Sequence, residues 1–343
     1  MKKAGIVYFT SKGMDVAEKV KAILGAEGFQ VAIRDKEKDE SLSKWTESVF
    51  SEDQLVVFIS ATGIAVRTIA PWLKSKITDP GVICIDDNGK FVIPLVAGHI
   101  GGANKMAEIV AGKLGGIPVV TTATDVNGKI AIDSWAKENN LVIENMEAAK
   151  ECAMRLLEGK PVGLWSLVPV ECQAEGIEIA ILDKFRYEFG INISWYIRRL
   201  FPRELKLVPK GLVLGIGCRR GIKQEVIERV VSEILMENGI CFSGISTVAT
   251  IDLKKDEEGL LGFCREHGFK FMTLSVQELA QAPGDFPQSE FVKKITGVDN
   301  VCQRAAAVAC PEGQVILEKK ARDGVTVSVA VPRNLKEDVL YVK

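Results

Sequence analysis

The chain has 343 residues, of which 47% are hydrophobic and 26% are charged, and its 44 Lys and Arg residues against 45 Asp and Glu residues leave a net charge of −1. This length predicts two or three domains, and the balanced charge gives no reason to expect nucleic acid or an anionic membrane as the main partner. The first residues are too poor in apolar side chains for a signal peptide, and no apolar stretch approaches the roughly 20 residues that cross a bilayer.

Short apolar runs alternate with helical patterns over residues 1–140. Strands are expected at 4–9, 29–33, 55–60, 82–86, 90–96 and 118–122, and helices at 14–24, 64–73 and 103–114. This alternation predicts a doubly wound, mostly parallel α/β sheet, a Rossmann-like N-terminal domain in which ligands bind beyond the carboxyl ends of the strands. Asn88-Gly89 predicts a hairpin turn before the strand at 90–96.

Three polar loops, at 60–63, 98–104 and 121–125, follow strands and are expected to gather at one sheet edge. Glycines let a ligand approach the backbone, and the amides that open a helix can bind an anion. His99 is a candidate base or substrate ligand because its ordinary pKa lies near neutrality. The candidate catalytic residues are His99 and Asp125, and the candidate substrate-binding residues here are Thr62, Gly63, Gly98, Gly101, Gly102 and Asn104.

Each of these residues also has a purely structural interpretation. The glycine loop can be a tight turn that needs only backbone freedom, and Thr62 or Asp125 can cap a helix or a turn. No G-x-G-x-x-G follows the first strand and no G-x-x-x-x-G-K-[ST] occurs, which disfavours dinucleotide and P-loop sites. Eight cysteines without a Cys-x-x-Cys pair, beside two histidines, argue against structural zinc and fit reduced thiols in a cytoplasm.

Residues 141–210 are expected to form a small middle α/β region whose fold the pattern leaves open, and 211–343 a separate C-terminal α/β domain. At 212–221 a strand again meets glycines before a helix, and Gly217, Arg219, Arg220 and, after a later strand, Lys254 are candidate substrate ligands. A guanidinium can hold both oxygens of a carboxylate. Cys218 is either a nucleophile or small buried filler, and His267 is expected to be structural.

From the residues alone, two domains that each carry a glycine loop with anion-binding potential predict a large polycarboxylated ligand held in a cleft between them. With those residues in view, the chain resembles the CbiG family of cobalamin-biosynthesis proteins along nearly its whole length. The segments that carry the resemblance are Ser60–Ile64, Gly98–Asn104, Thr121–Asp125, Gly215–Gly221, Thr250–Lys254 and Thr296–Val298.

The resemblance implies a hydrolase of the anaerobic corrin pathway. Water would open the δ-lactone of cobalt-precorrin-5A, and the extruded carbon would leave as acetaldehyde to give cobalt-precorrin-5B. Cobalt would belong to the substrate, with no cofactor and no metal held by the protein itself. We expect His99 to activate water, the helix-start amides at Gly101 and Gly102 to stabilise the oxyanion, and Arg219, Arg220 and Lys254 to hold carboxylates.

Two other functions stay open at this point. One is a non-catalytic corrinoid carrier that passes intermediates between pathway methyltransferases, and the weaker one is a sugar- or nucleotide-binding transferase. A cytoplasmic location, a homodimer and transient contact with the methyltransferases are further expectations, with no nucleic-acid or membrane partner.

Overall fold

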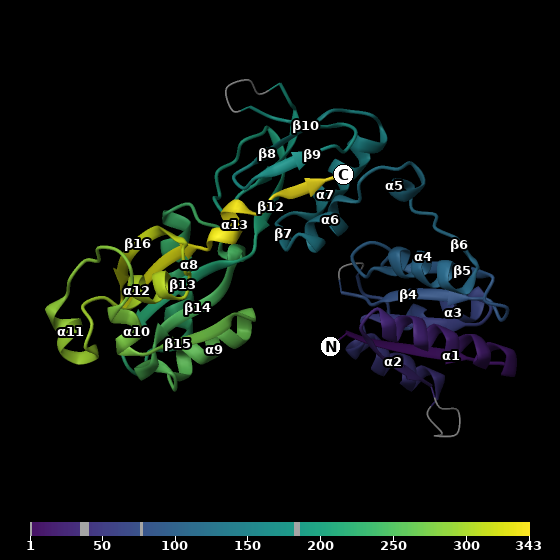
Figure 1. The fold of residues 1–343 in the computed structure, drawn as a ribbon, viewed down its shortest axis with the longest axis horizontal. Helices are drawn as coiled ribbons and strands as arrows, with labels where there is room; N and C mark the ends of the chain where they lie inside the picture. The colour runs from purple at the N-terminus through teal and green to yellow at the C-terminus, as the bar shows by residue number, and fades with distance from the viewer. Residues whose placement is uncertain (1, 35–40, 76–77, 182–185) are drawn as a thin grey trace. The chain divides into compact units, whose positions relative to one another are not determined.

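The computed structural model describes residues 2–34, 41–75, 78–181 and 186–343, and the chain divides into two compact units, residues 1–135 and 136–343. Both units are built from β-strands and α-helices (Figure 1). The predicted α/β class is therefore confirmed. Among the described residues no helix is long and apolar enough to cross a membrane.

The first unit is built on a six-stranded sheet with the strand order β2-β1-β3-β4-β5-β6. Four neighbouring strands run parallel, β5 runs antiparallel to β4, and β6 runs parallel to β5, which confirms a mostly parallel sheet. The strands are β1 (Lys2–Tyr8), β2 (Phe29–Ile33), β3 (Leu55–Ile59), β4 (Gly81–Ile85), β5 (Phe91–Val96) and β6 (Ile117–Pro118). The predicted Asn88-Gly89 turn joins β4 to β5, with Gly89 at φ 69°.

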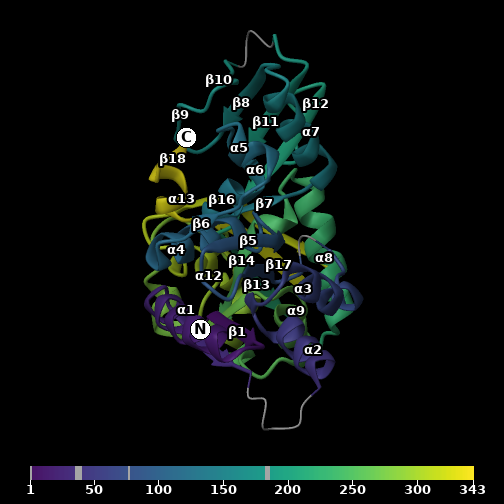
Figure 2. The same ribbon diagram turned by 90° about the vertical axis from the view of Figure 1, so that its right-hand side faces the viewer.

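Helices cover both faces of this sheet, and β3 and β4 are therefore buried along their whole length. The helices that cover it are α1 (Ser11–Ala26), α2 (Leu42–Glu52), α3 (Thr62–Ile69) and α4 (Ala103–Leu114). α5 (Ala123–Val126) and α6 (Ile132–Glu138) follow along the chain, and the boundary between the two units falls within α6. Apolar residues of α1 and α4 pack on one face, and those of α2 and α3 on the other (Figure 2). The sheet is thus doubly wound, as predicted.

Two expected elements of this unit are shorter than the pattern suggested. The helix expected at 64–73 ends at Ile69 and continues only as a 3-10 turn, Ala70–Trp72. The strand expected at 118–122 ends at Pro118. Pro71 removes a backbone donor that a longer helix would need. In β6 the bonds to β5 come from the amides of Ile117 and Val119, and no further pairing with β5 follows them among the described residues.

The second unit holds two five-stranded sheets. The first has the order β10-β8-β11-β12-β7 and is packed against α7 (Met146–Leu157). Its strands are β7 (Leu141–Ile143), β8 (Val162–Ser166), β10 (Ile177–Ile179), β11 (Phe189–Ile193) and β12 (Arg203–Pro209). Trp195 and Phe201 are buried in the core beside this sheet. This sheet answers the question that the sequence left open for residues 141–210.

The other sheet has the order β15-β14-β13-β17-β16. Its strands are β13 (Leu212–Cys218), β14 (Ile245–Ile251), β15 (Lys270–Leu274), β16 (Gln314–Arg322) and β17 (Val325–Val331). Its helices are α8 (Gln224–Glu237), α9 (Glu258–His267), α10 (Val276–Ala280), α11 (Glu290–Thr296) and α12 (Val301–Val308). β13, β14 and β15 are parallel, and β16 and β17 form an antiparallel pair.

Each of the three predicted domains holds one of these large sheets, and the exact boundaries stay a prediction. One feature of the structure departs from the expected division. After α13 (Arg333–Glu337), the last strand β18 (Leu340–Val342) pairs in parallel with β9 (Val170–Cys172) of the middle region. The end of the chain therefore contributes a strand to the middle region, which a pattern read along the sequence does not reveal.

Candidate active site

His99 lies between two carboxylates in the first unit. Its Nε2 is 3.0 Å from Asp125 Oδ2, and its Nδ1 is 3.3 Å from Asp133 Oδ1. The loop after β5 carries His99, α5 carries Asp125 and the first turn of α6 carries Asp133. The imidazole side chain is 17% exposed, so it is largely buried but still accessible to solvent.

This arrangement favours the imidazolium form of His99. A neutral imidazole has one nitrogen that only accepts, and that nitrogen would face a carboxylate oxygen. The protonated ring instead donates to both carboxylates. The hydrogen bond to Asp133 is the largest influence, and together with Asp125 it raises the pKa of His99 above its ordinary value despite the opposing effect of burial.

Asn104 holds Asp125 in place. Its Nδ2 donates to Asp125 Oδ2 at 2.7 Å and to Thr122 Oγ1 at 2.9 Å. Asn104 is buried in the second position of α4, so its side chain is fixed by packing. Within the described part of the chain nothing hydrogen-bonds the second carboxylate oxygen, Asp125 Oδ1. The carboxylate thus has one oxygen that is anchored and one that can accept a proton.

The glycines of this loop are needed for close packing. A Cβ on Gly98 would lie 2.5 Å from Asn104 Oδ1, and a Cβ on Gly101 would lie 2.5 Å from the Ala97 Cβ and 2.9 Å from the Gly81 nitrogen. Gly102 differs, because it faces open space and is required for its φ of 77°. The loop therefore packs tightly on Asn104 and on the start of β4.

Three amides at the start of α4 are already occupied, so the expectation is wrong for the Gly102 amide and stays a prediction for the Gly101 amide. Gly102 N donates to His99 O at 2.9 Å, Ala103 N to Ala97 O at 3.3 Å and Asn104 N to Gly98 O at 3.0 Å. The loop curls back and supplies backbone carbonyls to the helix end, which leaves these three donors occupied. An oxyanion needs other donors here.

The expectation that three polar loops share one edge is also wrong. The loops at 98–104 and 121–125 do meet, through Asn104 and His99. The third does not, because β5 is antiparallel to β4, with Val96 opposite Val82 and Val92 opposite Ile85. Thr62 and Gly63 follow the other end of the parallel strands, and the five residues of β3 separate the two edges by about 16 Å.

The four candidate residues of the C-terminal domain line one cavity of about 850 Å³: Gly217, Arg219, Arg220 and Lys254. The cavity lies where β13 and β14 end, beside the β16–β17 hairpin and α11. Arg219 and Arg220 are exposed, and neither guanidinium has an ion-pair partner among the described residues. Exposed apolar side chains share the lining, with Leu253 at 52% and Ile295 at 61% exposure.

Lys254 is not a free cation. Its Nζ lies 2.9 Å from Glu257 Oε2, and both side chains are largely buried. Glu257 also accepts from the Gly221 amide. Burial opposes ionisation of Glu257, but the bonds from Lys254 and Gly221 outweigh it and lower the pKa of this carboxyl. The pair ties the glycine loop after β13 to the end of β14.

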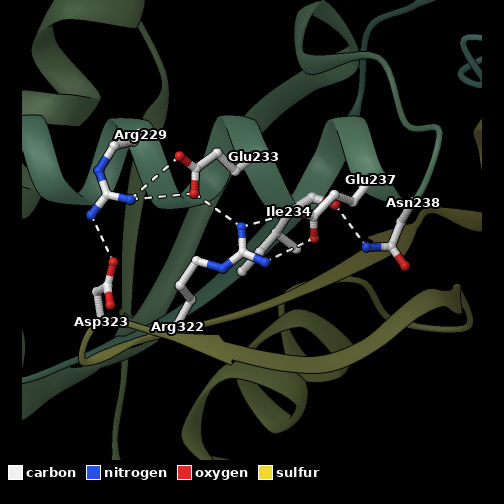
Figure 3. Close-up of polar contacts among 7 residues, drawn as sticks. All are labelled: Arg229, Glu233, Ile234, Glu237, Asn238, Arg322 and Asp323. Atoms are coloured by element: carbon white, nitrogen blue, oxygen red, sulfur yellow. Dashed lines mark hydrogen bonds and ion pairs between the residues drawn. The ribbon is translucent and has the colours of Figure 1, made fainter.

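A network of ion pairs fixes the hairpin that walls this cavity (Figure 3). Arg322, at the end of β16, bonds Glu233 at 2.9 Å and Glu237 at 3.0 Å on α8, and Arg229 of α8 reaches Asp323 at 2.7 Å. Arg322 lines the cavity, yet its charge is already matched by two carboxylates. Arg219, Arg220 and Lys319 therefore line the cavity without an ion-pair partner among the described residues, so they are open to a ligand.

The surroundings of Cys218 and His267 decide between the interpretations that the sequence offered for these two residues. Burial raises the pKa of Cys218 to about 11, so the side chain is a thiol at neutral pH and not an activated nucleophile. His267 contacts Glu228 at 3.1 Å and stacks on Phe269, which confirms its structural role. All eight cysteines are free, and no group of three or more metal-ligating side chains occurs in the described ranges.

Sequence reasoning missed Asp133, Glu257 and Lys319. Asp133 stands in the first turn of a helix that the pattern did not predict, and Glu257 follows the candidate Lys254 by three residues without a signal of its own. Lys319 lines the cavity from β16, a strand predicted without a role. An acidic residue that opens a short helix after the 121–125 loop was the one available signal for Asp133.

Family models match the chain in three consecutive parts. "Cobalamin synthesis G N-terminal" covers residues 44–125, "Cobalamin biosynthesis central region" covers 130–209 and "Cobalamin synthesis G C-terminus" covers 212–330. The chain is 33% identical over 304 residues to a protein of Salmonella typhimurium named cobalt-precorrin-5A hydrolase, with 85% of this chain and 86% of that protein covered.

A protein of Methanocaldococcus jannaschii named probable cobalt-precorrin-5A hydrolase is 30% identical over 341 residues, covering 95% of this chain and 98% of that protein. A protein of a Sinorhizobium species named CobE is 28% identical over 130 residues, which cover 37% of this chain and 84% of that protein. The similarities thus run through all three large sheets and through the residues of both sites.

Proposed function

Since the chain belongs to the CbiG family of cobalamin-biosynthesis hydrolases, we propose that it opens the δ-lactone of cobalt-precorrin-5A and releases acetaldehyde to give cobalt-precorrin-5B. Two things support this proposal: the family match along the chain and the presence of an anchored carboxylate beside a protonated imidazole. The proposed chemistry rests mainly on one observation, that His99 lies between Asp125 and Asp133.

The reaction needs a base first and an acid afterwards. Water loses a proton as its oxygen adds to the lactone carbonyl, and the ring C–O bond then breaks to leave a carboxylic acid and an alkoxide. The alkoxide becomes the carbonyl of acetaldehyde as its carbon separates from the macrocycle. The electron pair of that C–C bond stays on the macrocycle, which takes up a proton.

We assign the base to Asp125 and the acid to His99. Asp125 Oδ1 can accept the proton of water while Asn104 and His99 hold Oδ2. The His99 imidazolium can stabilise the developing negative charge and return a proton. This reverses the role expected for His99, because an imidazole whose pKa is raised by two carboxylates is a poorer base at neutral pH.

We assign macrocycle binding to the cavity of the C-terminal domain. Its apolar lining suits the flat face of a tetrapyrrole, and Arg219 and Arg220 suit the peripheral carboxylates. Micromolar binding corresponds to a binding free energy of ~8 kcal/mol. Two charge-assisted hydrogen bonds contribute ~1.5–3 kcal/mol each, and apolar contact would supply the rest. That this cavity and the His99 site act on the same bound macrocycle stays a prediction.

Acetaldehyde is the product that tests the proposal. The purified full-length chain, mixed with cobalt-precorrin-5A, should release acetaldehyde in equal amount to the cobalt-precorrin-5B formed, measured by aldehyde-dependent oxidation of NADH with alcohol dehydrogenase. A spectral change of the macrocycle without acetaldehyde would contradict a hydrolase and would favour the non-catalytic carrier.

Several finer statements belong to the same proposal. We expect the chain to need no cofactor, because the cobalt ion arrives within the substrate. A cytoplasmic location, a homodimer, and transient contact with the methyltransferases that precede and follow it remain predictions, as do Thr62 and Gly63 as substrate ligands.

A further inference from the structure

A second cavity, of about 310 Å³, lies between the middle region and the end of α8. Trp165, Tyr196, Leu200 and Gly239 supply much of its wall, and Ser194, Arg198 and Asn238 supply polar groups. It shares no lining residue with the cavity assigned to the macrocycle. Its position follows from the sheet, because Trp165 on β8 and Asn192 on β11 are cross-strand neighbours, and Ser194 is two residues further along.

Behind this cavity lies a buried lysine that has no carboxylate partner. Lys206 is 9% exposed, and no Asp or Glu of the described residues lies within ion-pair distance of its Nζ. The carboxylate on the same strand, Glu204, instead accepts from the amides of Leu200 and Phe201. Burial is the largest influence and lowers the pKa of Lys206, while Glu204 and Glu144 favour the ammonium only from beyond ion-pair distance, so the presence of this lysine needs an explanation.

Lys206 reaches the cavity through Ser194. Its Nζ lies 2.5 Å from Ser194 Oγ and 3.2 Å from Asn192 Oδ1. Ser194 Oγ in turn lies 3.1 Å from Asn192 Oδ1 and 3.3 Å from Tyr196 O, both of which are long for hydroxyl hydrogen bonds. When the Lys206 ammonium donates a hydrogen bond to Ser194 Oγ, the Ser194 hydroxyl can donate its own hydrogen bond. A stronger acceptor in the cavity can accept that bond.

A second cation stands at the opening of the same cavity. Arg198 is exposed, and its guanidinium has no ion-pair or hydrogen-bond partner in the part of the chain that the structure describes. Half-buried Trp165 and Tyr196 add aromatic surface beside it. The cavity therefore combines a guanidinium, a polarised hydroxyl and aromatic walls in a volume that fits a small ligand.

We propose that this cavity binds a carboxylate carried on a flat apolar body, with Arg198 and the Ser194 hydroxyl holding its oxygens and Lys206 supplying charge through Ser194. Two sources of such a group are open, a peripheral acid chain of the macrocycle or a free small organic acid. The binding chemistry is the same for both. The proposal does not depend on the hydrolysis, because it concerns binding alone.

The probe is 4-fluorobenzoate, observed by fluorine NMR with the full-length chain, and 4-fluorobenzamide is its neutral isostere. We expect the benzoate to bind and the benzamide to bind at least about tenfold more weakly, because a hydrogen bond to a charged group contributes more than one to a neutral group. Ser194→Ala and Arg198→Gln should each weaken benzoate binding about tenfold or more. Lys160→Met, which changes a surface lysine of the same region, should not.

Lys206→Met separates a binding role from a structural one. Replacing a buried, unpaired ammonium by an apolar side chain of similar length should raise the melting temperature while abolishing benzoate binding. Equal binding of benzoate and benzamide, or unchanged benzoate binding in Ser194→Ala and Lys206→Met, would overturn the proposal. If Lys206→Met does not fold, Ser194→Ala and Arg198→Gln still decide.

Adding cobalt-precorrin-5A to the probe complex identifies the source. Release of bound 4-fluorobenzoate by the macrocycle supports an acid chain of the substrate as the occupant. Retention of the probe at saturating macrocycle supports a free small acid. Both readouts measure binding and not turnover. A chain that binds the probe but releases no acetaldehyde would therefore contradict the proposed hydrolysis and still support this binding site.

Discussion

His99 Nδ1 and Asp133 Oδ1 lie 3.3 Å apart, which joins the loop after β5 to the first turn of α6. The contact gives the imidazole a second carboxylate besides Asp125, and both ring nitrogens then act as donors. In the mechanism that we propose, His99 therefore acts as the acid, and Asp125, with its open oxygen, acts as the base.

The ionisation of His99 can be observed directly, because the chain has only two histidines. The ring should titrate above its ordinary pKa of 6.5, chiefly because of the hydrogen bond to Asp133, and Asp133→Asn should lower that pKa. Proton NMR of the imidazole signals measures this, with His267→Gln to assign them. A His99 titration that does not move in Asp133→Asn would refute the contact.

The same pKa shift makes stability depend on pH. A folded pKa that is raised above the unfolded value stabilises the fold fully below pH 6.5, and that contribution is lost as pH rises through the folded pKa. The difference in unfolding free energy between the wild type and His99→Gln should therefore be constant below pH 6.5 and shrink above it. Urea unfolding at several pH values measures it, and a difference that grows with pH would contradict this sign.

Gly98 and Gly102 offer a matched pair of substitutions in one loop. Gly98→Ala would push a Cβ into the Asn104 amide that holds Asp125, so we expect activity to fall about tenfold or more. Gly102→Ala meets open space and only strains a φ of 77°, which should cost about 1 kcal/mol of stability and leave turnover near wild type. Equal activity losses in both variants would show that backbone strain alone is responsible.

Lys254 and Glu257 form a largely buried ion pair, and we expect the effects of substituting them on the unfolding free energy to be coupled. Lys254→Met leaves an uncompensated carboxylate and should cost about 3 kcal/mol of unfolding free energy. Adding Glu257→Gln should recover most of this loss, because Gln keeps an acceptor for the Gly221 amide. Urea unfolding of the two single variants and the double variant closes the cycle, and simple additivity would show that the pair is not coupled.

Arg219 and Arg220 should contribute to binding and not to the chemical step. Arg219→Gln or Arg220→Gln is expected to raise KM for the macrocycle about tenfold, with little change in kcat, because each removes one charge-assisted bond. Arg333→Gln, which changes a surface arginine paired with Glu312 and Glu337, is the control. A fall in kcat at constant KM would place these arginines in the reaction itself.

Much of the fold follows from local pattern, but the direction of a strand does not. The buried runs at β3 and β4 and the Asn88-Gly89 turn were enough to predict a doubly wound sheet with a returning strand. The consequence of that return, that His99 and Thr62 lie at opposite edges, needed the strand register. Likewise, β18 pairs with a strand far away in the sequence, and no local signal marks such a contact.

The candidate sites divide in the same way. Residues that stand in a glycine loop after a strand were found, including His99, Asn104 and Arg219. Their partners were not, because Asp133 and Glu257 act through tertiary contacts that composition and spacing do not encode. The helix-start amides were misjudged because the carbonyls that occupy them come from the fold of the loop itself.

The central claim is that Asp125 is the base, and one comparison tests it most directly. Acetaldehyde release from cobalt-precorrin-5A should fall about 100-fold or more in Asp125→Asn, which keeps the size and the acceptor oxygen but cannot take up a proton. Asp15→Asn, a surface change on α1, should release acetaldehyde at the wild-type rate. Turnover of Asp125→Asn within a few-fold of wild type would contradict the assignment.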